Sequence, residues 1–239
     1  MQKLFFLILL LGSVPGALRA SSITLAPVRL ELSASRPYAV LRMTNNGSEP
    51  VTLQARPYRW SFDARGDVLT ATDNVILNPP IATLPPKGVQ LVRIGLRVPN
   101  EDANEATYRL IIDEVPVKKA GAKGMSLTMV LRMSVPVFAL PRRPVSPRLE
   151  WSAHRDAAGV LKIAAVNRGA AHVLIKSFHV SRGADNQEAE TFKDLAYLLP
   201  NQQREWTLKK ANLAAATELT LEAVTDGGNV RQTLTPASN

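Results

Sequence analysis

The stretch MSLTMVLRMSVPVF, residues 125–138, alternates between apolar and mixed side chains over more than ten positions. Side chains point to opposite faces in turn along a strand, so its odd-numbered residues form one row. The members of this row are all apolar: Met125, Leu127, Met129, Leu131, Met133, Val135 and Val137. The pattern is long for a globular strand, and methionine suits surfaces that must fit several partners. Two interpretations follow: a core strand, or an edge strand that lends its apolar row to another protein.

Residues 1–20 have the pattern of a signal peptide. Lys3 gives a basic start, residues 4–11 are apolar but too few to span a bilayer, and residues 17–20 resemble a cleavage site that ends at Ala20. No later apolar run has membrane-spanning length. We therefore expect an exported chain without an integral membrane segment.

Composition limits the kinds of site that the chain can carry. The 239 residues include no cysteine, which excludes disulfides, thiolate metal sites and cysteine nucleophiles. The net charge of +9 suggests nucleic acid at first, but the basic residues are scattered and few aromatics lie among them. We expect no nucleic-acid partner. An anionic partner, a membrane surface or solubility alone explains the charge better.

Short alternating runs separated by turn residues follow the signal peptide. About seven strands are expected before residue 139, with turns every 8 to 12 residues, and Asn45-Asn46-Gly47 has the composition of a hairpin turn. This pattern is typical of an immunoglobulin-like sandwich. The expected strands cover residues 23–32, 38–44, 51–60, 89–98, 108–115 and 127–138, with a further short piece near 76–84.

A proline-rich basic segment, Pro141 to Pro147, predicts a domain boundary. The strand pattern resumes beyond it, with turns at Asn167-Arg168-Gly169 and at residues 226–228. The sequence thus predicts an all-β protein: an N-terminal domain over residues 21–141 and a second, smaller β-sandwich over residues 142–239.

Motifs for catalysis are missing from the sequence. The three histidines, His154, His172 and His179, have no metal-ligand spacing, and no G-x-S-x-G, P-loop or G-x-G-x-x-G motif occurs. Asp113 and Glu114 are adjacent, so on a strand they face opposite ways and cannot act as an acid–base pair. We expect no enzyme, no catalytic residue, no metal and no cofactor.

Arginines on the expected strands are the unusual polar feature. Arg109 and Arg132 have apolar neighbours in the sequence. A half-buried guanidinium pairs best with a carboxylate or phosphate, which it can bind through two parallel hydrogen bonds.

Three motifs, in this order and spacing, carry a resemblance to a known family. They are NPPIATLPPKG at residues 78–88 with QLVRI at 90–94, EATYRLIIDEVP at 105–116, and RMSVPVF at 132–138. The chain resembles the periplasmic chaperones of chaperone–usher pilus assembly over essentially its whole mature length. The Tyr-Arg pair of the second motif and the SVPVF of the third are similar to the archaic branch, which builds spore-coat-U or Csu-like pili.

The resemblance implies two immunoglobulin-like β-sandwich domains in an L or boomerang arrangement. It also implies that the last strand of the first domain is donated to a pilin subunit that lacks one strand. Its plug residues would be Leu127, Met129, Leu131 and Met133. The partners are then pilin subunits and an outer-membrane usher, the compartment is the periplasm, and no cofactor takes part.

The resemblance further implies two sets of charged residues. The first set anchors the pilin C-terminal carboxylate: Arg109 and Arg132, with Arg29 as a third candidate, because Pro136 stands where the better-known branch has a lysine. The second set, Arg93, Glu105 and Asp226, would form an interdomain ion-pair network.

The alternative function is an exported two-domain structural or adhesive surface protein. Such a protein should show a ligand groove or an N-terminal donor extension. The expected mature N-terminus enters a strand within two or three residues, which leaves little room for an extension.

Overall fold

The computed structural model describes residues 22–63, 66–116, 130–182, 189–193, 195–210, 213 and 215–238. The predicted signal peptide and the predicted plugs Leu127 and Met129 lie outside these ranges. Every element with described bounds is a β-strand, and among the described residues Leu213 alone is helical, which confirms the all-β prediction.

The first sandwich consists of two sheets. One sheet has the order β1 (Ile23–Ala26), β3 (Tyr38–Asn45), β8 (Val89–Leu96) and β6 (Val75–Asn78). The other has the order β2 (Leu30–Leu32), β10 (Arg132–Ala139), β9 (Ala106–Glu114), β4 (Val51–Asp63) and β5 (Gly66–Ala71), with β7 (Ile81–Leu84) also paired to β4. The chain therefore changes sheet between β1 and β2, within the run predicted as one strand.

Alternation along the strands builds the core of this sandwich. Inward positions such as Leu41, Val92, Leu110 and Ile112 are fully buried, and on β3 and β8 their neighbours in sequence are exposed. Apolar burial of this extent is the main stabilising contribution.

The second sandwich also consists of two sheets. The first runs β16 (Gln203–Thr207), β12 (Leu161–Asn167), β11 (Leu149–Arg155) and β19 (Ala237–Ser238). The second runs β14 (Glu190–Phe192), β13 (Val173–Ser181), β17 (Leu219–Thr225) and β18 (Gly228–Leu234), with β15 (Ala196–Leu198) paired to β13. The turn predicted at residues 226–228 closes the β17–β18 hairpin.

The hairpin predicted at Asn45-Asn46-Gly47 is wrong. Strands β3 and β4 lie in different sheets, so this loop crosses between the layers. The buried Asn45 side chain donates to the carbonyls of Glu49, Leu84 and Pro85 and accepts from the Gly47 amide. An asparagine side chain that forms hydrogen bonds with loop backbone groups can stabilise a connection between two sheets as well as a hairpin turn within one sheet.

Asn167 performs the same task in the second sandwich. Its buried amide donates to Ala171 and Leu198, and its carbonyl oxygen accepts from the Gly169 amide. Both Asn-x-Gly sequences therefore connect β-layers through a buried asparagine.

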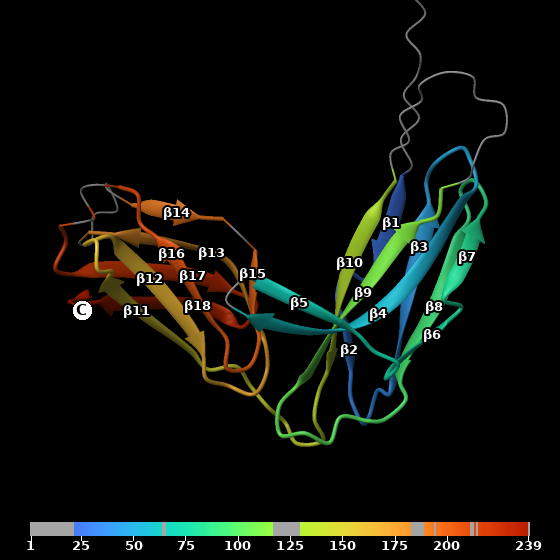
Figure 1. The fold of residues 1–239 in the computed structure, drawn as a ribbon, viewed down its shortest axis with the longest axis horizontal. Helices are drawn as coiled ribbons and strands as arrows, with labels where there is room; N and C mark the ends of the chain where they lie inside the picture. Colours follow the sequence, from blue (N-terminus) through green and yellow to red (C-terminus); the bar gives the residue numbers. More distant parts are fainter. Residues whose placement is uncertain are drawn as a thin grey trace, which may run out of the picture.

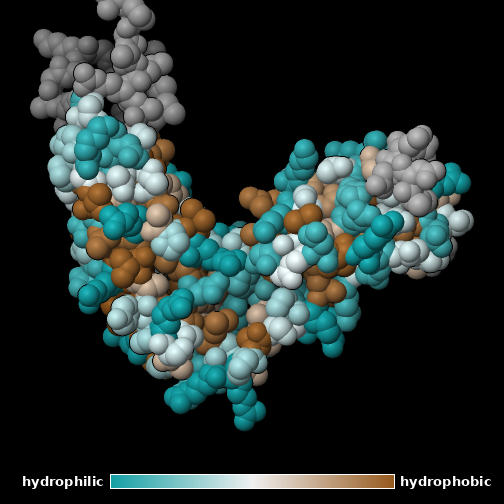
Figure 2. All heavy atoms as spheres, turned by 180° about the vertical axis from the view of Figure 1, so that it is seen from behind, coloured by the Kyte–Doolittle hydropathy of each residue, from teal (hydrophilic) through white to brown (hydrophobic). Residues whose placement is uncertain are grey.

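The two sandwiches meet at an angle, and the β4–β5 hairpin reaches from the first toward β15 of the second (Figure 1). The space-filling view shows the same two lobes with a notch between them (Figure 2). A small apolar cluster joins the lobes: Trp60 of β4, Phe138 of β10 and Leu199 are buried together, with Tyr197 packed against them. The described residues include no helix with the length and apolar character needed to cross a membrane.

Candidate functional site

Strand β10 has an open edge along most of its length. One side pairs with β9 from Arg132 to Ala139, whereas the other pairs with β2 at Val137–Ala139 alone. In the described part of the chain, residues 132–136 thus have no strand partner on the side away from β9. Figure 1 shows this edge turned toward the space between the sandwiches. Unpaired strand groups of this kind are a template for an added strand.

The structure places the residues of the predicted apolar row in two different environments. Val135 and Val137, at 2% and 1% exposure, belong to the core of the first sandwich, and Met133 is half-buried against that core. Leu131 is half-buried just before β10, and its backbone pairs with Glu114 at the end of β9. The core-strand interpretation therefore holds for the C-terminal part of the row, and Leu131 is the described plug candidate that this core does not include.

Arg109 lies on β9 directly opposite Pro136 of the open strand. Its guanidinium carbon is 3.7 Å from the centre of the Trp60 ring and 5.7 Å from that of Tyr197. Burial lowers the pKa of Arg109, because the charged form loses water. Among the described residues, no carboxylate forms an ion pair with Arg109. A half-buried cation in this state is a strong site for an incoming anion.

Arg29 lies across the same cleft but is already paired. Its Nη1 donates to Asp226 Oδ2 of the second sandwich at 2.7 Å, and its Nε is 3.2 Å from Glu31. Tyr197 lies between the two arginines: burial raises the pKa of its phenol, and the charges of Arg29 and Arg109 oppose this effect. The cleft therefore holds two cations from the first sandwich and a phenol from the second.

Arg132 is not brought together with Arg109. It pairs across the strands with Asp113, four positions along β9 from Arg109, which is roughly 13 Å at strand spacing. Its Nε donates to Asp113, which also accepts from Arg56, and these two guanidinium groups lower the pKa of the Asp113 carboxyl. Arg132 is largely exposed at this position.

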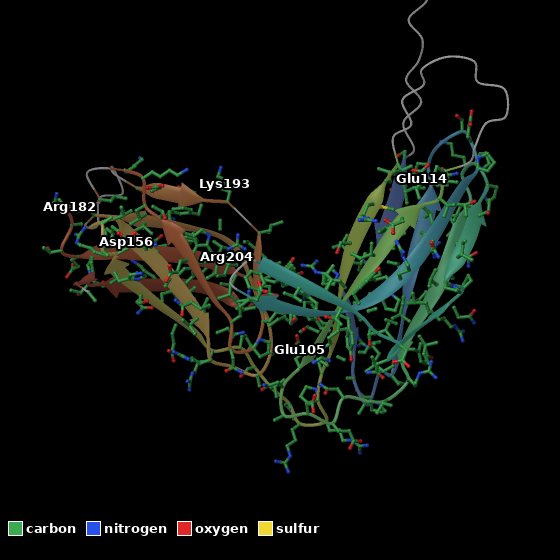
Figure 3. The ribbon with its side chains drawn as sticks, viewed as in Figure 1. Glu105, Glu114, Asp156, Arg182, Lys193 and Arg204 are labelled. Atoms are coloured by element: carbon green, nitrogen blue, oxygen red, sulfur yellow. The ribbon has the colours of Figure 1, made fainter. Side chains whose placement is uncertain are left out.

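The interdomain network contains two of the three residues expected from the sequence. Glu105 accepts from His172 Nδ1 at 2.9 Å, and His172 Nε2 lies 4.0 Å from Asp226. The His172 ring is stacked on Phe138 with 3.5 Å between ring centres. Figure 3 places Glu105 where the two sandwiches meet and Glu114 at the opposite end of the first sandwich.

Arg93 lies elsewhere. It projects from β8 over the Tyr38 ring, 5.9 Å from its centre, and forms no ion pair with Glu105 or Asp226 within the described ranges. His172, which was not among the expected members, lies between the two carboxylates.

Sequence reasoning did not assign Trp60, His172 or Tyr197 to this cleft. The chain is only 5% aromatic, so Trp60 and Tyr197 were a usable signal for a contact surface. Their partners lie far away in sequence, and no local spacing reveals them. No cluster of potential metal-binding side chains occurs in the described residues.

Comparison with known proteins identifies the family. Residues 22–144 match the model described as the pili and flagellar-assembly chaperone, PapD N-terminal domain. Chaperone protein FimB/FhaD of Bordetella pertussis is 26% identical over 168 residues, which cover 64% of this chain and 66% of that protein's length.

Solved structures show a similar two-domain fold. The CsuC-CsuE chaperone–tip subunit pre-assembly complex of Acinetobacter baumannii includes a chain that matches with a TM-score of 0.66 and 19% identity, covering 90% of this chain and 99% of that one. The Salmonella enterica complex of SafA pilin with the SafB chaperone matches with a TM-score of 0.66 and 15% identity, covering 91% and 99%. The predicted pair of immunoglobulin-like sandwiches is confirmed by these matches. Because the family model covers more than half of the sequence, this chain belongs to the pili and flagellar-assembly chaperone family of the PapD type.

Proposed function

We propose that this protein binds a pilin subunit along the open edge of β10 and completes the subunit's fold by donor-strand complementation. The observation that carries the proposal is the unpaired edge at residues 132–136, which leads directly to the cleft that holds Arg109. An extended pilin strand on this edge would form backbone hydrogen bonds with β10, a known mode of peptide recognition.

Arg109 is the proposed anchor for the pilin C-terminal carboxylate. It is the cleft arginine that forms no ion pair in the described structure, although the charge of Asp67 acts on it from a distance, and it lies opposite Pro136, at the inner end of the open edge. A pilin carboxylate at Arg109 would accept charge-assisted hydrogen bonds, and the half-buried guanidinium would gain an anionic partner. Arg29 contributes further positive charge to the cleft, whereas Arg132 lies beside Asp113 and is not part of the proposed anchor.

Leu131 is the proposed plug within the described residues, and Leu127 and Met129 continue the same sequence pattern toward the N-terminus. Burying one such side chain in a pilin groove would contribute about 1.5–3 kcal/mol. Covering that groove would prevent pilin aggregation through its exposed edges.

The setting of this activity is also a proposal. We infer that the chain acts in the periplasm after removal of residues 1–20, and that it delivers its pilin to an outer-membrane usher. The archaic branch is inferred from the Tyr108-Arg109 pair and the SVPVF motif.

Hydrogen exchange of the chaperone with and without its cognate pilin tests the strand pairing. We expect the backbone amides of Arg132 and Ser134 to gain protection in the complex, because alternate amides of β10 point away from β9 and would donate to the added strand. The other sheet offers a matched control in β6, an edge strand whose amides should exchange at an unchanged rate. Equal exchange at β10 in the free and bound states would contradict the proposal.

A further inference from the structure

A tyrosine of the second sandwich lies against the first sandwich. Tyr197 is the middle residue of β15, and its neighbours Ala196 and Leu198 are buried in the second core, so its side chain points out of that core. The ring packs against Trp60 of β4 and Phe138 of β10, with 5.7 and 5.5 Å between the ring centres. The second sandwich thus supplies part of the wall of the cleft.

The Tyr197 hydroxyl lies among the charged groups of the cleft. Burial raises the pKa of the phenol, and the charges of Arg29, Arg109 and Asp226 also act on it. A phenol whose pKa is raised stays neutral near pH 7 and keeps a proton that it can donate. The guanidinium carbon of Arg109 is 5.7 Å from the centre of the Tyr197 ring. An anion bound to Arg109 would therefore lie within reach of this hydroxyl.

The described part of the chain offers no acceptor for this proton. Arg29 faces the phenol oxygen, but a guanidinium carries donors alone. The Asp226 carboxylate accepts from Arg29 and from the Leu174 amide, and no carbonyl or carboxylate oxygen of a described residue accepts from the Tyr197 hydroxyl. Tyrosines in packed surroundings usually place the hydroxyl against a partner. A ligand in the cleft can supply the acceptor that the described residues do not.

We propose that the Tyr197 hydroxyl is a second donor to the pilin carboxylate, which then bridges the two sandwiches with one oxygen on Arg109 and the other on Tyr197. This inference rests on the proposed function and extends its site into the second sandwich. A carboxylate has two oxygens that each accept at about 2.8 Å from a donor, so one group can bind both side chains. Asp226 accepts from Arg29 in the same cleft at 2.7 Å, so this interdomain contact helps to set the distance between the two donors.

Removing a single oxygen atom tests the assignment. Tyr197→Phe deletes the hydroxyl and keeps the ring that packs against Trp60 and Phe138. It should bind a pilin with a free C-terminus at least about tenfold more weakly than the wild type, because a hydrogen bond to a charged group is lost. Binding of a C-terminally amidated pilin should change far less, since the amide carries no charge. Tyr38→Phe is the matched control: it deletes an exposed phenol hydroxyl on β3 in the other sheet and should alter neither affinity.

The melting temperature of the free protein separates binding from folding. Tyr197→Phe should melt as the wild type does, because its hydroxyl donates to no described residue. Unchanged affinity for the pilin with a free C-terminus, or equal weakening toward both pilins, would overturn the assignment. A lower melting temperature together with that equal weakening would show that the hydroxyl serves the fold instead.

The behaviour of the wild type distinguishes this inference from the proposed function. If the wild type prefers the free over the amidated pilin and Tyr197→Phe keeps the whole preference, the role of Tyr197 alone fails. If the wild type shows no preference, the Arg109 anchor fails and the role of Tyr197 fails with it. If the wild type captures no pilin, the proposed function itself fails.

A carboxylate that binds both sandwiches should also restrict the angle between them. The chain has no cysteine, so spin labels at Val89→Cys and Gln232→Cys, two exposed positions, report one distance between the sandwiches. Pulsed electron paramagnetic resonance should show a distance distribution that narrows when the wild-type background binds pilin with a free C-terminus. With Tyr197→Phe at saturating pilin the distribution should narrow less. Equal narrowing in the two backgrounds would contradict the bridge.

Discussion

The Arg109 guanidinium lies 3.7 Å from the centre of the Trp60 ring, in a cleft between two β-sandwiches. Burial has partly dehydrated this cation. The π-electrons of the ring stabilise its charge without neutralising it. A carboxylate can therefore still bind. The following predictions test how this cleft, the open strand and the interdomain contacts work together.

Charged substitutions at the start of β10 should separate pilin binding from folding. Leu131→Glu should remove pilin capture while the free chaperone melts at nearly its normal temperature, because the side chain is outside the core. Met133→Glu should lower the melting temperature itself, since it brings a charge against the first core. Circular dichroism and pilin pull-down of both variants distinguish the two effects. Equal destabilisation by both changes would place Leu131 in the core.

Asp226→Asn should loosen the junction between the sandwiches. The carboxylate accepts from Arg29 and lies beside His172, so its loss leaves Arg29 without its interdomain partner. The expected cost is about 1.5–3 kcal/mol, or a drop in melting temperature on the order of 5 °C. Glu222→Gln is a control on β17, the strand that leads into the turn at Asp226, and its ion pairs are more exposed and should contribute less.

Small-angle scattering of Asp226→Asn should also show a wider distribution of interdomain angles. Adding Arg29→Ala should cost little more, because both changes remove one contact. A double variant whose losses simply add would contradict the direct pairing.

Acid should remove the contribution of the Asp113 carboxylate to the stability of the fold. Arg132 and Arg56 lower its folded-state pKa, so its carboxylate stabilises the fold above the unfolded pKa of about 3.9. That contribution is lost as the pH falls below this value and through the lower folded pKa. The stability difference between wild type and Asp113→Asn, measured by thermal melts from neutral pH downward, should be constant above about pH 5 and then shrink. A difference that grows as the pH falls would show that the shift has the opposite sign.

Much of the fold was predictable because alternation and turn residues are local signals. The strands around residues 38–45, 89–96 and 106–114 follow directly from the sequence pattern. The failure at Asn45 has a physical cause: Asn-Asn-Gly specifies a turn, but the buried side-chain amide connects loops of two sheets. A local motif cannot state which sheet the next strand will join.

The site was less predictable, since it forms where the two sandwiches meet. The sequence identified Arg109 and Arg29 as candidates but not their environment. Strand register decides that Arg132 lies beside Asp113, and tertiary packing decides that His172 rather than Arg93 joins Glu105 to Asp226. Neither arrangement can be predicted from the spacing of residues along one strand.

Pilin affinity in a two-by-two set tests the central claim most directly. Wild-type and Arg109→Ala chaperones are each titrated with a pilin that has a free or an amidated C-terminus, and Arg109→Lys is added as a partial rescue because it keeps the charge without the planar fork. We expect Arg109→Ala and amidation each to weaken binding by about 1.5–3 kcal/mol, and the two together to cost little more than either one, since they remove the same contact. Fully additive losses, or unchanged affinity after amidation, would contradict the anchoring of the pilin carboxylate by Arg109.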